Sequence, residues 1–136
     1  MPPTKHLLQY VQAFFHEHLA AQRGLSPHTV LAYRDALKLF LMFVSQHVRR
    51  PATKLTLNDL QVDNVLPFLD DLEQQRHNGI VTRNLRLAAL RTFFKYLVAE
   101  DPLHAGQYQR VVAIPFKQRP HPTLEYLEVS EIKAVP

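Results

Sequence analysis

The chain has 136 residues, a formal net charge of +4, three glycines and no cysteine. The length suits one domain with a hydrophobic core of its own, while so few glycines exclude a glycine-rich phosphate-binding loop and the lack of cysteine excludes disulfides and thiolate metal sites. No apolar run approaches the roughly 18 residues of a membrane span, and the N-terminus has no signal-peptide pattern, so we expect a soluble, cytoplasmic protein.

The first predicted helix runs from about Lys5 to Ala21 and ends at Arg23 and Gly24, since glycine commonly follows a helix C-terminus. Its apolar residues recur at spacings of three and four, which predicts one buried stripe. These residues are Leu7, Leu8, Val11, Phe14, Phe15 and Leu19.

The second predicted helix has the clearest start, because Ser26 is a favoured N-cap and Pro27 suits the first helical position. It ends at Arg49, Arg50 and Pro51. Further apolar residues beside its stripe predict that most of its surface is covered and that it is the central helix. The predicted core stripe is Val30, Tyr33, Leu37, Phe40, Leu41, Val44 and Val48, and the residues beside it are Leu31, Leu39, Met42 and Phe43.

Two more long helices are predicted before a short fifth one. The third runs from about Asp63 to Gln75, with Pro67 placed in its first turn. The fourth begins near Thr82 as N-cap, and Pro102 stops it. The short helix spans about His104 to Val112. The residues expected to point inward are Val65, Leu66, Phe68, Leu69 and Leu72 in the third helix and Leu87, Leu90, Phe93, Phe94 and Leu97 in the fourth.

The composition changes after Ile114, where three prolines and two basic residues in IPFKQRPHPTLEYL predict an extended linker. The segment LEVSEIKAV then resembles the first turns of another helix. We therefore expect a helical domain over residues 1–114, a linker and partial second domain over 115–136, and a chain that is part of a longer protein. The predicted fold is all-α, an orthogonal bundle of four main helices plus a short fifth.

Charge is sorted by segment. The stretch from Asn78 to Ala99 holds Arg83, Arg86, Arg91 and Lys95 with no acidic residue, whereas the preceding TLNDLQVDNVLPFLDDLEQQ holds only acidic charges. One basic helix on an otherwise balanced domain is typical of a protein that binds a polyanion. A solvated face on an ordinary bundle explains the same charges equally well.

Three blocks resemble the tyrosine recombinase, or phage-integrase, family. The first is GLSPHTVLAYRDALKLFLMFV, which shares the family's Gly-Leu-Ser-x-x-Thr start and Tyr-Arg pair at Gly24, Ser26, Thr29, Tyr33 and Arg34. The second is TRNLRLAALRTFFKYLVAEDP, similar to the family's Thr-x-Asn-x-Arg-Leu-x-x-Leu-Arg-x-Phe helix and its Asp-Pro ending. The third, LEVSEIKAV, resembles the entry to the catalytic domain. The chain departs from the pattern at Leu85, where the family often has a second arginine.

This resemblance implies a SAM-like core-binding domain that forms half of a clamp around duplex DNA and acts with other recombinase protomers, as a tetramer in the full-length protein. The family cleaves DNA with a tyrosine that forms a 3′-phosphotyrosine, and its catalytic residues lie in the C-terminal domain. The resemblance therefore implies that this chain alone has no catalytic residues and does not cut DNA.

The predicted DNA contacts lie near the starts of the second and fourth helices, where free N–H groups and the helix dipole favour phosphate. Basic and hydroxyl side chains there would add charge-assisted contacts. As an alternative, the threonines serve only as caps and the arginines are only solvated. We expect Arg83 and Arg86 to lie in the exposed first turn of the fourth helix. Arg91 either reaches a phosphate or pairs with the acidic third helix, and we expect Lys95 to form that pair. The predicted set is Thr29, Arg34, Thr82, Arg83, Asn84, Arg86 and Arg91.

Other candidate residues are interpreted as structural. Tyr33 is expected to pack in the core. The His-x-x-Arg sequence from His47 to Arg50 matches a recombinase catalytic box but lies in the wrong domain, and Tyr126 lies too early to be the nucleophile. The eight histidines are dispersed, so we expect no metal and no cofactor.

Two other classes of protein remain as alternatives. A helical protein-interaction module would use the acidic third helix and the apolar first helix. A helix-turn-helix transcription factor is less consistent with the sequence, because that motif needs a turn of three to four residues between its helices and Ser26 lies far from Thr82.

Overall fold

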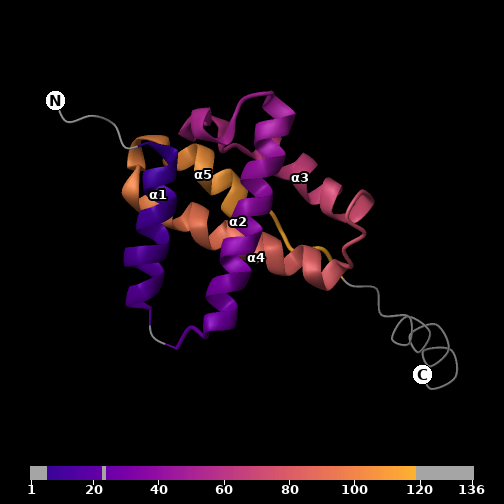
Figure 1. Cartoon of the computed structure of the whole chain (residues 1–136), viewed down its shortest axis with the longest axis horizontal. Helices are drawn as coiled ribbons and strands as arrows, with labels where there is room; N and C mark the ends of the chain where they lie inside the picture. Colours follow the sequence, from indigo (N-terminus) through magenta and orange to yellow (C-terminus); the bar gives the residue numbers. More distant parts are fainter. Residues whose placement is uncertain (1–5, 23, 119–136) are drawn as a thin grey trace, which may run out of the picture.

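All the secondary structure of the computed structural model, which describes residues 6–22 and 24–118, is helical (Figure 1). This confirms the all-α fold. The five α-helices are α1 (Leu7–Ala13), α2 (Pro27–Val48), α3 (Val62–Gln74), α4 (Ile80–Glu100) and α5 (Ala105–Val112). Four short segments join them: a π-helix over Phe14–Leu19 and 3-10 turns over Ala52–Lys54, Leu57–Asp59 and Pro102–His104.

The central helix is α4, which contacts α2, α3, α5 and the π-helix that follows α1. In Figure 1, α2 crosses α4 steeply while α1 and α3 lie on opposite sides of that crossing. The expectation that α2 is central is wrong, because its side chains Leu31 and Met42 remain 52% and 45% exposed. The buried residues of α4 instead extend around the helix: Leu87, Ala89, Leu90, Phe93, Phe94, Tyr96 and Leu97.

Aromatic rings from several helices meet around α4. Phe14 meets Phe93 edge-on with ring centroids 5.2 Å apart, and Phe94 meets Tyr108 of α5 at 6.1 Å. All four side chains are fully buried. Offset and edge-to-face pairs of this kind add to the stabilisation from apolar burial. The five core residues predicted for the fourth helix are confirmed as buried.

The first helix is not one continuous α-helix, as the sequence analysis expected. It changes at Phe14 into a π-helix that runs to Leu19. Because a π-helix closes i→i+5 hydrogen bonds, residues five apart lie over one another. Phe14 and Leu19 are buried in this way, whereas Phe15 is only half-buried.

The predicted start of α2 is confirmed. The backbone N–H of Thr29 donates to the Ser26 hydroxyl at 3.1 Å, and Pro27 occupies the first helical position. The helix ends at Arg49, which adopts a left-handed conformation with φ 58°. A side-chain cap therefore marks the start of this helix, and a left-handed backbone conformation marks its end.

The connection from α2 to α3 belongs to the core. Leu55 and Leu60 are buried, and the Asp59 carboxylate is 7% exposed. That carboxylate accepts the backbone N–H of Thr56 at 2.8 Å and pairs with the guanidinium of Arg50. This pairing satisfies a buried charge that would otherwise be costly.

The third helix differs from its prediction at two residues. Leu66 is 46% exposed rather than inward. Pro67 is the sixth residue of α3, so it lies inside the helix and not in the first turn. The remaining predicted core residues of α3, Val65, Phe68, Leu69 and Leu72, are buried.

The junction between α4 and α5 contains a buried tyrosine. The Tyr108 hydroxyl donates to Asp101 Oδ2 at 2.6 Å, and Asp101 directly follows the last residue of α4. Burial, followed by the bond to this carboxylate, raises the pKa of Tyr108 well above its ordinary value. The predicted stop at Pro102 and the short fifth helix are confirmed.

Candidate nucleic-acid interface

The basic helix α4 begins earlier than predicted. Its N-cap is Gly79, so Thr82 lies inside the first turn with an exposed side chain and is not the N-cap. No side chain among the described residues caps this end of the helix. The first N–H groups of α4 are therefore available to an anion, and the helix dipole favours negative charge there.

Two of the predicted contact residues in this first part of α4 are less exposed than expected. Arg83 and Arg86 are both half-buried. Arg86 donates to the Asn78 side-chain oxygen at 2.7 Å, across the turn between α3 and α4. Arg83 donates to Asn84 Oδ1 at 3.0 Å, while its Nε is buried without a partner in the described part of the chain. Both arginines thus combine a packed stem with a charged end.

The Asn84 side chain is occupied by the backbone of a distant residue. Its Nδ2 donates to the Lys117 carbonyl at 2.9 Å, and its Oδ1 accepts the Lys117 N–H at 3.0 Å. The sequence does not predict the role of Lys117, because a contact across 33 residues leaves no local pattern.

Further along α4, Arg91 lies against an aromatic ring. Its guanidinium carbon is 4.7 Å from the centroid of the Phe116 ring, in cation–π geometry. Neither Arg91 nor Lys95 forms an ion pair with α3 within the described residues. The prediction that Lys95 pairs with the acidic third helix is therefore wrong. The acidic residue Glu73 of α3 pairs instead with Lys117, at 2.8 Å.

The candidate residues of α2 have different surroundings. Thr29 belongs to the N-terminal cap, where its hydroxyl lies 3.1 Å from that of Ser26. Arg34 lies in the third turn of α2, not in its opening turn, with its guanidinium 5.7 Å from the Phe15 ring. Tyr33 is half-buried and packs against the core, as expected.

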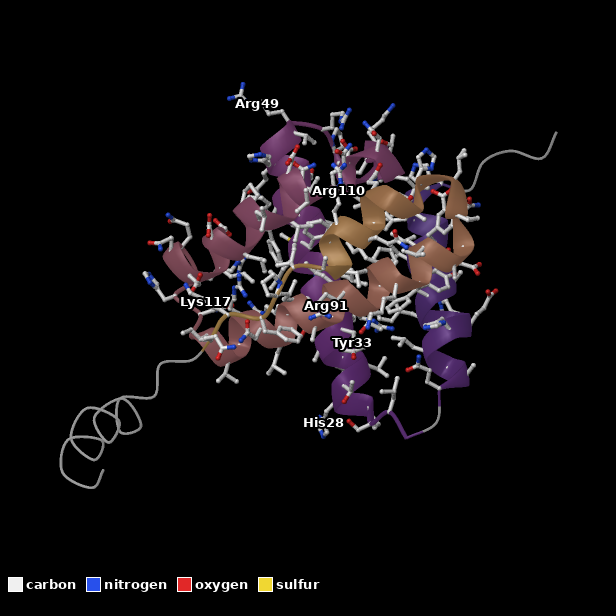
Figure 2. All side chains as sticks on the ribbon, turned by 180° about the vertical axis from the view of Figure 1, so that it is seen from behind. His28, Tyr33, Arg49, Arg91, Arg110 and Lys117 are labelled. Carbon is white, nitrogen blue, oxygen red and sulfur yellow. The ribbon has the colours of Figure 1, made fainter. Side chains whose placement is uncertain are left out.

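The two groups of candidate residues are not joined by any contact that the described residues show. Helices α2 and α4 cross near their middles, and both N-terminal ends lie in the lower half of Figure 1. Figure 2, from behind, labels Arg91 of α4 and Tyr33 of α2 close to that crossing. The basic residues of α4 therefore lie on one continuous helix, whereas the start of α2, where Figure 2 labels His28, lies away from the crossing.

An apolar groove of about 390 Å³ lies between α1 and α2. Arg34 and Lys38 of α2 are among its lining residues, together with Phe15, Leu41 and Met42. This position directs Arg34 towards α1.

The His-x-x-Arg sequence has structural contacts. The ring of His47 stacks on Phe43 with centroids 5.4 Å apart, and Arg50 pairs with Asp59. Tyr126 lies outside the described residues. Within those residues no three His, Asp or Glu side chains are placed to hold a metal ion, and none of the described helices has the length and apolar character needed to cross a bilayer.

The described residues form an all-helical domain with one basic helix, and comparison with known proteins shows the family to which this domain belongs. Residues 12–101 match the family of phage integrase N-terminal SAM-like domains. The chain belongs to this family. No solved structure matches the chain with significance.

Two curated relatives support the assignment to this family. The chain is 39% identical to the inferred integrase/recombinase y4rD of Sinorhizobium fredii, over 97% of this chain and 48% of that protein. It is 36% identical to the tyrosine recombinase XerC of Roseiflexus castenholzii, over 76% of this chain and 31% of that protein. The chain thus spans about half or less of the relatives it matches.

Proposed function

We propose that this chain supplies a duplex-DNA-binding domain of a site-specific tyrosine recombinase, one half of a clamp around the recombination site. The observation that carries the proposal is α4, a long helix with an uncapped N-terminus and no acidic residue before Glu100, in a domain of the integrase family. Phosphate contacts to such a helix would fix the position of the domain on the duplex. Other protomers would act with it, making four in the assembled complex, this one included.

The proposed contacts are centred on the first half of α4. Arg83, Arg86 and Arg91 supply charge, and Thr82 together with the free N–H groups of the first turn supplies hydrogen-bond donors. Thr29 would add a hydroxyl from the start of α2. Arg34 is directed into the groove beside α1, so we leave it outside the contact set.

Exposed apolar side chains on the same helix suit contact with base edges or sugars. Val81 and Leu85 are 50% and 65% exposed and lie one turn apart on α4. An apolar side chain reads the methyl group of thymine in the major groove. Leu85 therefore adds an apolar contact at the position where the resemblance leads one to expect a second arginine.

We assign strand cleavage to the part of the recombinase that follows this domain. Supercoiled plasmid incubated with this chain is accordingly expected to stay supercoiled. A covalent adduct between DNA and Tyr126 would contradict the assignment.

The direct test replaces single arginines by glutamine and measures affinity for duplex DNA by fluorescence anisotropy. Arg83→Gln and Arg86→Gln should each weaken binding and reduce the salt dependence by about one ion. Lys54→Gln, which removes an exposed charge from the connection after α2, is the matched control and should have little effect. Equal losses from all three variants would indicate only a net-charge effect and would contradict contact through α4.

The same variants should be examined by urea unfolding. Because Arg86 bonds to Asn78, its replacement should cost about 1 kcal/mol of stability, more than an exposed surface change would. The binding assay therefore has to be carried out well below the unfolding midpoint of that variant.

A second function, docking of a protein partner, is favoured by the groove between α1 and α2. Its apolar floor and the exposed Met42 resemble a surface that accepts an apolar side chain. Met42→Glu separates the two proposals, since it should abolish such docking while leaving the arginine effects on DNA binding unchanged.

A further inference from the structure

The backbone that follows α5 is held against the side of α4. Residues 115–118 form an extended segment that runs along α4 after the buried Ile114 (Figure 2). Asn84 is the central contact, because its amide bonds to both the N–H and the carbonyl of Lys117, at 3.0 and 2.9 Å. One side chain thus satisfies both backbone polar groups of a residue 33 positions away.

Two further contacts flank this pair. The ammonium of Lys117 donates to Glu73 Oε1 of α3 at 2.8 Å. The ring of Phe116 lies 4.7 Å from the guanidinium carbon of Arg91. We call these five residues, Glu73, Asn84, Arg91, Phe116 and Lys117, the exit clamp.

We infer that the exit clamp fixes the point and direction at which the chain leaves the helical domain, and that Asn84 is its positioning residue rather than a contact to DNA. An amide side chain has two lone pairs and two N–H donors. Three of these four are used, since Oδ1 accepts both Lys117 and Arg83 while one N–H donates to Lys117. Most of the hydrogen-bonding capacity of the Asn84 amide is therefore used within the domain, and one N–H is left over.

The contacts act together because side chains of two helices, α3 and α4, hold the adjacent residues Phe116 and Lys117. Ordering a short extended segment that has no secondary structure costs conformational entropy. A single surface ion pair offsets little of that cost. Bidentate backbone bonding by a half-buried asparagine supplies the geometric restraint that the ion pair alone lacks. Holding residues 115–118 in this way fixes their position relative to α4, whichever ligand the domain binds.

Trypsin tests the clamp directly, because it cleaves after Lys117 only when the surrounding backbone leaves α4. The rate at the Lys117–Gln118 bond, followed by mass spectrometry, reports local opening. Cleavage at Arg110–Val111, inside α5, serves as the internal reference for global unfolding. Asn84→Ala should accelerate the first cut by about tenfold relative to the second, which corresponds to loss of roughly one well-formed hydrogen-bonded contact.

Two other variants complete the test. Gln74→Ala changes an exposed side chain of α3 that makes no hydrogen bond within the described residues, and it should leave both rates unchanged. Glu73→Gln removes the ion pair but keeps Asn84, so it should accelerate the Lys117–Gln118 cut less than Asn84→Ala does.

Three results would overturn the inference. The first is an unchanged rate at Lys117–Gln118 in Asn84→Ala. The second is equal acceleration of both cuts together with a lower melting temperature, which would make Asn84 a residue of general structural importance. The third is a loss of DNA affinity without faster cleavage, which would make Asn84 a DNA contact. Because the rates are measured without DNA, failure of the proposed function leaves this result intact.

Discussion

Among single residues, Asp59 shows best how a buried charge is accommodated in this domain. It is 7% exposed, and it joins the 3-10 turn before α3 to the residue that follows the end of α2 through Arg50. Its second oxygen accepts the Thr56 N–H at 2.8 Å. The Asp59 carboxylate thus connects two parts of the segment between α2 and α3, which the sequence alone identifies only as a loop.

Replacing Asp59 should therefore be costly. Asp59→Ala leaves the Thr56 N–H and the Arg50 guanidinium without their partner and should lower the free energy of unfolding by about 2–3 kcal/mol. Asp63→Ala, at an exposed residue of α3, is the control and should stay within about 0.5 kcal/mol. Urea unfolding measures both. Similar small values for the two variants would mean that the carboxylate contributes nothing beyond a surface charge.

Tyr108 provides a prediction about pH. Burial raises its pKa in the folded protein above the ordinary value of 10.0, so the unfolded chain releases this proton first as the pH rises. The contribution of Tyr108 to the free energy of unfolding is therefore complete well below pH 10. It decreases above that pH, because the folded state then binds more protons than the unfolded state.

The comparison that isolates this effect is Tyr108→Phe. Between about pH 9 and about pH 11 the wild type should lose stability more steeply than the variant, as measured by urea unfolding at a series of pH values. Parallel curves would show that the phenol ionises as readily in the folded state as in the unfolded one.

At the scale of helices, the sequence predicts starts and stops best where local chemistry determines them. Ser26 and Pro27 start α2 through contacts within one turn, and Pro102 stops α4 because it cannot continue a helix. The start of α4 was misplaced because Thr82 looks like a better cap than Gly79, whereas the turn that Asn78 and Arg86 hold together selects the earlier residue. The π-helix after α1 was missed because the apolar spacing was interpreted with an α-helical period alone.

Burial within a helix can be tested with a matched pair on α4. Leu90→Ala deletes a fully buried side chain and should cost about 2–5 kcal/mol. Leu85→Ala makes the same chemical change at a residue that is 65% exposed and should cost about 0.5 kcal/mol or less. Thermal or urea unfolding distinguishes them. Equal losses would contradict the orientation of α4.

For the molecule as a whole, the sequence predicted the all-α fold and the family, because periodicity and motifs are local. It did not predict which helix is central, since Leu31, Met42 and Leu66 are apolar yet exposed. The role of Leu55 and Leu60 in the core and the contact of Asn84 with Lys117 depend on how distant segments meet. Charge and motif indicate the candidate DNA contacts, whereas their hydrogen-bond partners, such as Asn78 for Arg86, depend on how the chain folds.

The central claim is that the basic helix α4 binds the phosphates of duplex DNA. Fluorescence anisotropy with a labelled duplex, repeated from about 50 mM to about 200 mM salt, tests it most directly. With three arginines each neutralising one phosphate, we predict a dissociation constant of roughly micromolar or weaker at physiological salt and a log–log slope of roughly −3. Binding that does not depend on salt, or no binding at the lowest salt, would contradict the claim.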